Sequence, residues 1–76
     1  MRSFHHDDAW DAGGLACGPM LLALRVRLER LSPGQVFRLV TVDEGAPVDV
    51  PAWCRLTGHV LLEASPPTYY LARRKD

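Results

Sequence analysis

Residues 11–24 read DAGGLACGPMLLAL and decide how the first half of the chain folds. Gly13 and Gly14 predict a turn, and the apolar run that begins at Gly18 predicts an amphipathic helix. Cys17 then lies at the N-terminus of that helix. Unpaired backbone N–H groups and the positive end of the helix dipole favour a thiolate at such a position. The stretch therefore predicts a reactive cysteine with a lowered pKa.

The helix itself is expected over residues 18–31, because leucines recur there at spacings of three and four. They form one apolar stripe that consists of Leu21, Leu24, Leu28 and Leu31. Ser32, Pro33 and Gly34 end the helix. Before the glycines, residues 9–12 predict a short extended segment.

The second half of the chain predicts one helix among strands. Residues 35–42 are rich in β-branched and aromatic side chains on both alternating faces, which is typical of an interior strand. Residues 46–57 predict a helix that starts with a loose turn and becomes regular only with Pro51 in its first turn. Gly58 is expected to adopt the left-handed conformation just after it.

Two further strands are expected over residues 59–64 and 68–73, separated by Ser65, Pro66 and Pro67. The resulting order is βαβαββ. Such an order predicts an α+β fold, a two-layer α/β sandwich in which two helices pack on one face of a four-stranded mixed sheet. We expect residues 1–8 to form a flexible N-terminal tail and residues 9–76 to form a single domain.

Composition limits the function classes. The 76 residues have room for one small domain, and the apolar runs are too short to cross a bilayer. Nine basic and nine acidic residues balance, which argues against direct binding to nucleic acid. The N-terminus lacks the apolar core of an export signal, and two cysteines do not make a disulfide framework. We therefore expect a cytoplasmic protein with reduced thiols.

Cys54 and the histidines are expected to be structural. Cys54 follows Trp53 on the core side of the second helix, where burial raises a thiol pKa. A disulfide between Cys17 and Cys54 stays open, because the sequence does not give their separation. The histidines lack the paired Cys/His spacing of zinc modules, so no metal site is expected. His59 is interpreted as a partly exposed residue at the start of a strand that helps to cap the preceding helix.

The motifs in their order resemble the TusA-like (SirA-like) sulfur carriers. The resemblance covers the chain from Trp10 to Arg73 and rests on the following segments: Asp11-Ala12-Gly13-Gly14-Leu15-Ala16-Cys17, Leu21-Leu22, Asp43-x-Gly45, and Pro51-Ala52-Trp53-Cys54-Arg55-x-Thr57-Gly58-His59. It implies that Cys17 accepts persulfide sulfur from a cysteine desulfurase or rhodanese. A DsrE-like or other thiol protein would then accept the sulfur, for tRNA thiolation, molybdenum-cofactor chemistry or oxidative sulfur metabolism, and no cofactor or metal is required.

The chain departs from the family at the cysteine itself. The family pattern is Cys-Pro-x-Pro, whereas this chain has Cys17-Gly18-Pro19-Met20. Gly14, Gly18 and Pro19 are the residues expected to support the site, with Pro19 restoring part of the missing rigidity.

Three arginines on the first helix, Arg25, Arg27 and Arg30, have two interpretations. They either form a solvated helix face or dock a partner protein.

Two other function classes remain open. The first is a non-catalytic interaction or regulatory module on the same fold, in which the altered turn after Cys17 is only a surface loop. The second is a thiol redox protein, but such proteins prefer a Cys-x-x-Cys pair, and Met20 stands where the second cysteine would be.

Overall fold

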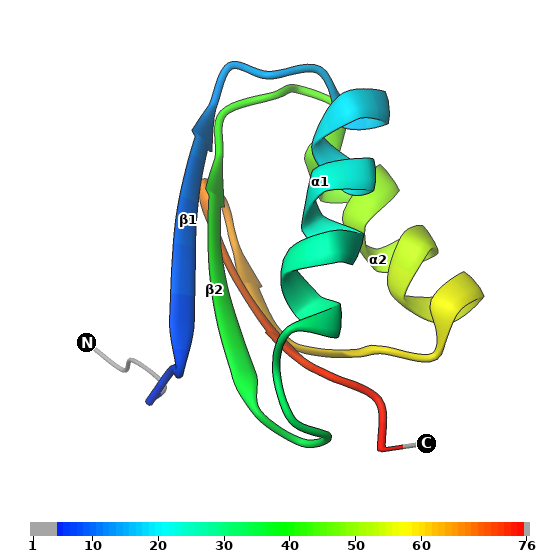
Figure 1. The fold of residues 1–76 in the computed structure, drawn as a ribbon. Coiled ribbons are helices and arrows are strands. Elements are labelled where there is room, and N and C mark those ends of the chain that lie inside the picture. Colours follow the sequence, from blue (N-terminus) through cyan, green and yellow to red (C-terminus); the bar gives the residue numbers. More distant parts are fainter. Residues whose placement is uncertain (1–4, 76) are drawn as a thin grey trace.

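The computed structural model describes residues 5–75 and has two layers. Its elements are β1 (Asp8–Gly13), α1 (Cys17–Glu29), β2 (Val36–Thr41), α2 (Ala46–Thr57), β3 (Val60–Ser65) and β4 (Thr68–Ala72). The strands form one four-stranded sheet in the order β1-β2-β4-β3. Both helices cover the same face of that sheet (Figure 1). The predicted α+β sandwich and its βαβαββ order are confirmed.

The sheet is mixed because its first pair of strands is parallel. β1 runs parallel to β2, with Asp11 opposite Val40, while β4 runs antiparallel to both β2 and β3. A parallel pair needs a crossover connection, and α1 supplies it. β2 lies between β1 and β4, so the predicted interior strand is also confirmed.

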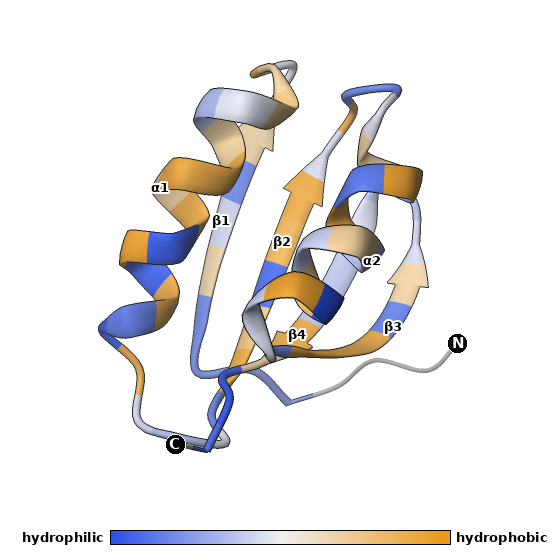
Figure 2. Ribbon diagram, turned by 90° about the vertical axis from the view of Figure 1, so that its right-hand side faces the viewer, coloured by the Kyte–Doolittle hydropathy of each residue, from blue (hydrophilic) through white to orange (hydrophobic). Residues whose placement is uncertain are grey.

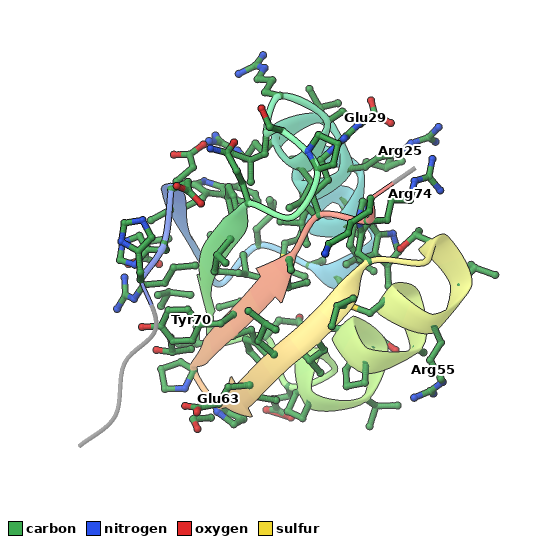
Figure 3. All side chains as sticks on the ribbon, turned by 90° about the horizontal axis from the view of Figure 1, so that it is seen from below. Arg25, Glu29, Arg55, Glu63, Tyr70 and Arg74 are labelled. Carbon is green, nitrogen blue, oxygen red and sulfur yellow. The ribbon has the colours of Figure 1, made fainter. Side chains whose placement is uncertain are left out.

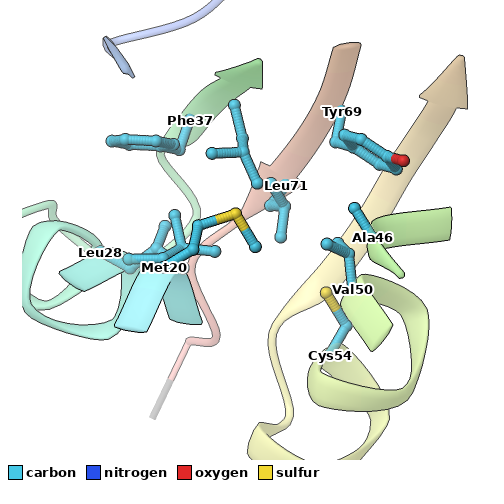
Figure 4. Close-up of a cluster of buried hydrophobic side chains, with 10 residues drawn as sticks. Met20, Leu28, Phe37, Ala46, Val50, Cys54, Tyr69 and Leu71 are labelled. Carbon is cyan, nitrogen blue, oxygen red and sulfur yellow. The ribbon is translucent and has the colours of Figure 1, made fainter. Parts of the chain in front are cut away.

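The core lies between the helices and the two central strands. Phe37, Leu39 and Leu71 project from β2 and β4 and are 0% exposed. Figure 2 shows the apolar residues of β2 in orange between the two helices. Figure 4 shows how the helix side chains meet this surface, and the contacts come from Met20, Leu24, Leu28, Ala46, Val50 and Cys54.

The apolar stripe of α1 differs in phase from the prediction. Met20, Leu24 and Leu28 are fully buried, whereas Leu21 and Leu31 are only partly buried at the edge of the core. Three side chains spaced by four residues lie along one line of a helix, and this line faces the sheet. The unbranched methionine, which a leucine pattern misses, completes it.

The start of α2 is a correction to the sequence analysis. The helix is regular from Ala46, and Pro51 lies inside it. Its first turn is fixed by hydrogen bonds that do not involve Pro51: Ala46 N–H donates to Asp43 O at 3.1 Å, and Asp49 N–H donates to Gly45 O at 2.8 Å. The helix ends as predicted, with Gly58 at φ +86°.

His59 is the second correction, because it neither lies at the surface nor caps α2. Its side chain is buried, and its Nδ1 accepts a hydrogen bond from the backbone N–H of Arg74 at 3.0 Å. Arg74 instead completes the end of α2, since its Nη1 donates to Thr57 O at 2.9 Å. Burial and the neighbouring arginines Arg74 and Arg73 lower the pKa of His59.

The N-terminal segment joins the sheet earlier than expected. Strand β1 begins at Asp8, and Asp7 exchanges two hydrogen bonds with Val36, one of them through its side chain. His5 and His6 precede this contact. The part of the predicted tail that spans residues 1–4 lies outside the described residues.

Truncating a core leucine should destabilise the fold much more than truncating an exposed one on the same helix. Leu24→Ala removes a 0% exposed side chain and should lower the free energy of unfolding by about 2–5 kcal/mol. Leu22→Ala changes a side chain that is 70% exposed and should stay within about 0.5 kcal/mol of wild type. Urea unfolding followed by circular dichroism measures both, and equal losses would contradict the described core.

Candidate functional site

Cys17 lies at the N-terminus of α1 as predicted, and it is the first residue of the helix, one residue before the expected start at Gly18. The chain reaches it through a sharp turn, because Gly13 has φ +57° and its N–H bonds to the side chain of Asp11 at 2.9 Å. Ala16 is extended, and no side chain caps the helix. The Cys17 side chain is half-buried, so its sulfur lies at the rim of the core and not inside it.

The residues predicted to support the site, Gly14, Gly18 and Pro19, lie close to Cys17 in the sequence, and the space around the two glycines is open. Gly18 and Pro19 are exposed in the first turn of α1, and Gly14 is exposed in the turn before it. A Cβ at Gly14 or Gly18 would meet nothing within 4 Å. Gly13 is the glycine that the backbone requires, because positive φ is costly for other residues.

Two carboxylates from the second half of the chain face the sulfur. Cys17 Sγ donates a hydrogen bond to Oδ2 of Asp43, in the loop between β2 and α2, at 2.7 Å. Asp49, in the first turn of α2, brings a second carboxylate to this space, and its charge also raises the pKa of the thiol. We call Asp43 and Asp49 the carboxylate pair. Sequence reasoning missed both as site residues; the Asp43-x-Gly45 motif after a strand was the available signal.

Gly45 makes this convergence possible. A Cβ at position 45 would lie 3.0 Å from Asp49 Oδ2, 3.2 Å from Asp43 Oδ2 and 3.7 Å from Cys17 Sγ. The missing side chain therefore leaves the space in which the three groups meet. Asp43 is also held in place, because its Oδ2 accepts from Gly45 N–H at 3.0 Å and its own N–H donates to Thr41 Oγ1 at 3.2 Å.

Partial burial and the carboxylate pair together reverse the predicted electrostatics of Cys17. Burial of the thiol, its hydrogen bond to Asp43 and the nearby carboxylate of Asp49 raise the pKa of Cys17 to about 12. The helix N-terminus alone predicts a lowered pKa, and that prediction is wrong. The negative charges oppose a thiolate at close range, and a carboxylate that accepts the S–H hydrogen bond stabilises the thiol.

Tyr69 adds a buried hydroxyl to the surroundings of the site. Its side chain is 0% exposed and lies beside Ala46 at the start of α2 (Figure 4). The hydroxyl has no hydrogen-bond partner among residues 5–75. Burial raises the pKa of Tyr69, and charge on Cys17 raises it further, which places the two groups within electrostatic reach.

Cys54 has the structural position that was predicted for it. It is 3% exposed in the core, and burial raises its pKa to about 11 against an opposing effect of Arg55. Both cysteines are free thiols, so the structure contains no disulfide between Cys17 and Cys54.

The three arginines of α1 have different surroundings. Arg25 is exposed and lines a groove of about 370 Å³ between the helices. The residues that line this groove are Gly18, Leu21, Leu22, Arg25, Glu29, Trp53, Leu56, Thr57, His59 and Arg74. Arg27 lies over the ring of Trp10, 4.4 Å from its centroid, and Arg30 is exposed at the end of the helix. Figure 3 shows Arg25 and Arg74 together at one corner of the molecule.

Neither a metal cluster nor a membrane span is found in the part of the chain that the structure describes. Residues 5–75 contain no group of three or more His, Cys, Asp or Glu side chains arranged to hold a metal ion. In the same residues, neither helix combines the length and apolarity that crossing a bilayer requires.

Comparison with known proteins identifies relatives over most of the chain. The family model of sulfurtransferase TusA matches residues 10–74. The sulfur carrier protein TusA of Pseudomonas entomophila is 30% identical over an alignment of 80 positions, which covers 100% of both chains. A protein of Neisseria meningitidis serogroup A, named as a candidate sulfur carrier, is 40% identical over 60 residues, or 79% of this chain and 81% of its own. One from Bacillus subtilis, named likewise, is 37% identical over 57 residues, covering 75% and 76%.

Alkylation by iodoacetamide should follow the raised pKa of Cys17. Because the pKa is about 12, the rate at Cys17 should rise about tenfold per pH unit between about pH 7 and pH 10, without a plateau. Cys54 should remain unlabelled until the protein unfolds, because it is buried. Peptide mapping by mass spectrometry measures both sites. A plateau for Cys17 below about pH 8.5, the value of a free thiol, would contradict the influence of the carboxylate pair.

Proposed function

Since the chain belongs to the TusA family of sulfurtransferases, we propose that it is a sulfur carrier that holds sulfane sulfur on Cys17 as a persulfide. The observation that carries the proposal is the contrast between its two thiols. Cys17 is half-buried at the start of α1, whereas Cys54 is buried in the core. A sulfur that passes between proteins must be reached by the reacting groups of both partners.

The proposed chemistry is an exchange at sulfur. The Cys17 thiol loses its proton to water, and the resulting thiolate attacks the terminal sulfur of a donor persulfide. The S–S bond of the donor breaks as a new S–S bond forms at Cys17, and the leaving thiolate of the donor takes up a proton. Transfer to the acceptor repeats the same step with the acceptor thiolate as the nucleophile, so no net oxidation or reduction occurs.

The partners follow from that chemistry. We propose a cysteine desulfurase or a rhodanese as the donor and a DsrE-like or other thiol protein as the acceptor. The exchange uses only sulfur atoms, so we propose no resident cofactor or metal. A cytoplasmic location would suit the carrier because both cysteines are free thiols, which reducing compartments preserve.

The alternative function is a non-catalytic interaction module on the same fold. The raised pKa of Cys17 favours it, because a thiol at neutral pH is a poor nucleophile. The replacement of the family Cys-Pro-x-Pro turn by Cys17-Gly18-Pro19-Met20 favours it as well. Sulfur uptake separates the two functions.

Incubation with a persulfide donor should add the mass of one sulfur atom to the reduced protein, and a reducing agent should remove it. Cys17→Ser should abolish the adduct, because a hydroxyl cannot form a persulfide. Intact-protein mass spectrometry with and without reductant measures the adduct.

Cys54→Ser is the matched control for this experiment. It should retain the sulfur adduct while losing stability, because it places a hydroxyl in the core. An adduct that follows Cys54, or the absence of uptake from any persulfide donor, would overturn the carrier function and support the interaction module.

A further inference from the structure

The free protein holds Cys17 in its less reactive form. Its Sγ donates a hydrogen bond to Asp43 Oδ2 at 2.7 Å, and the raised pKa keeps it a thiol at neutral pH. A carrier with such a cysteine would exchange sulfur slowly with any thiol or persulfide that it meets by chance. Productive transfer therefore requires a change in the surroundings of the sulfur when the partner arrives.

A bound partner could neutralise the negative charge of the carboxylate pair beside Cys17. Asp49 is exposed, and Asp43 is half-buried beside the half-buried thiol. Among residues 5–75 the ion pairs join His5 to Asp7 and Arg25 to Glu29, and neither member of the carboxylate pair has a cationic partner.

Asp43 and Asp49 thus place two negative charges next to a nucleophile. Neither charge has a counterion among the described residues, and the site they form is complementary to a positive charge. We propose that the carboxylate pair makes Cys17 selective for cationic sulfur donors and acceptors. In the free protein, Asp43 and Asp49 hold the sulfur as a thiol. A Lys or Arg beside the reacting sulfur of the partner pairs with them, and the Cys17 proton then leaves to water. This regulation rests on the proposed carrier function, and it assigns to Asp43 and Asp49 the role of positioning residues that act through Cys17.

Tyr69 supports the same assignment. Its hydroxyl is buried without a partner among the described residues and lies within electrostatic reach of Cys17. A hydroxyl is a donor that can stabilise a thiolate or a persulfide anion once the carboxylates are neutralised. The titratable groups that face Cys17 are therefore Asp43 from the β2–α2 loop, Asp49 from α2 and Tyr69 from β4.

Small disulfides of different charge test the proposal without a natural partner. Cystamine is cationic, 3,3′-dithiodipropionate is anionic, and bis(2-hydroxyethyl) disulfide is neutral. Each reacts with the Cys17 thiolate by the same exchange: the disulfide S–S bond breaks, a mixed disulfide forms on Cys17, and the leaving thiolate takes up a proton. The second-order rate of mixed-disulfide formation at low salt, measured by mass spectrometry, reports the selectivity.

Wild type should react with cystamine at least about tenfold faster than with the anionic disulfide, and added salt should reduce this ratio. Asp43→Asn and Asp49→Asn should each lower the ratio. Each should also increase the rate with the neutral disulfide and the rate of Cys17 alkylation between about pH 7 and pH 9. Asparagine keeps the side-chain oxygen that accepts from Gly45 N–H, so a loss of selectivity in Asp43→Asn reflects the lost charge.

Glu44→Gln is the matched control, because it removes the same charge from the exposed residue next to Asp43. It should leave the ratio within about twofold of wild type. Equal rates of wild type with the cationic and anionic disulfides, or an unchanged rate of Cys17 alkylation in both asparagine variants, would overturn the proposal. If the selectivity is observed but no persulfide donor loads Cys17, the carrier function fails while the charge selectivity stands.

Discussion

The parallel pairing of β1 with β2 is the constraint on which the site depends. Both strands end at the same edge of the sheet, where Gly13 lies opposite Thr41 and Val42 N–H donates to Gly13 O at 2.9 Å. Each strand leads directly into a helix on the same face (Figure 1). The start of α1 with Cys17 and the start of α2 with its carboxylates therefore meet at one corner of the molecule. An antiparallel pair would place these two loops at opposite ends of the sheet.

Two effects compete at Cys17, and their magnitudes decide the result. The dipole and free N–H groups at a helix N-terminus favour the thiolate by about 0.3–1 kcal/mol. A hydrogen bond to a charged group contributes about 1.5–3 kcal/mol, and here it stabilises the thiol. Partial burial of the thiol, the largest cause of its raised pKa, acts in the same direction as the hydrogen bond to Asp43 and the charge of Asp49. The position of a cysteine on a helix is thus insufficient to predict its reactivity when carboxylates of another segment face it.

The altered turn after Cys17 is accommodated by the core. Met20 N–H donates to Ala16 O at 2.9 Å, a bond that a proline at position 20 could not make. The Met20 side chain then fills the space under β2 and β4, where it is 0% exposed (Figure 4). Pro19 supplies a fixed φ in the first turn, where its missing N–H costs nothing. The departure from Cys-Pro-x-Pro therefore leaves α1 beginning at Cys17.

Four features were predictable from the amino-acid sequence: the order of the elements, the interior position of residues 36–41, the left-handed Gly58 and the place of Cys17 at a helix start. They follow from local propensities and from side chains a few residues apart, which a linear pattern records. That Asp43, 26 residues away, accepts the Cys17 hydrogen bond became visible only in the folded structure. Likewise, the sequence did not reveal that His59 binds the backbone of Arg74 across 15 residues. The pKa of a thiol depends on the charges within a few ångströms of it, and those neighbours are set by strand pairing and helix packing.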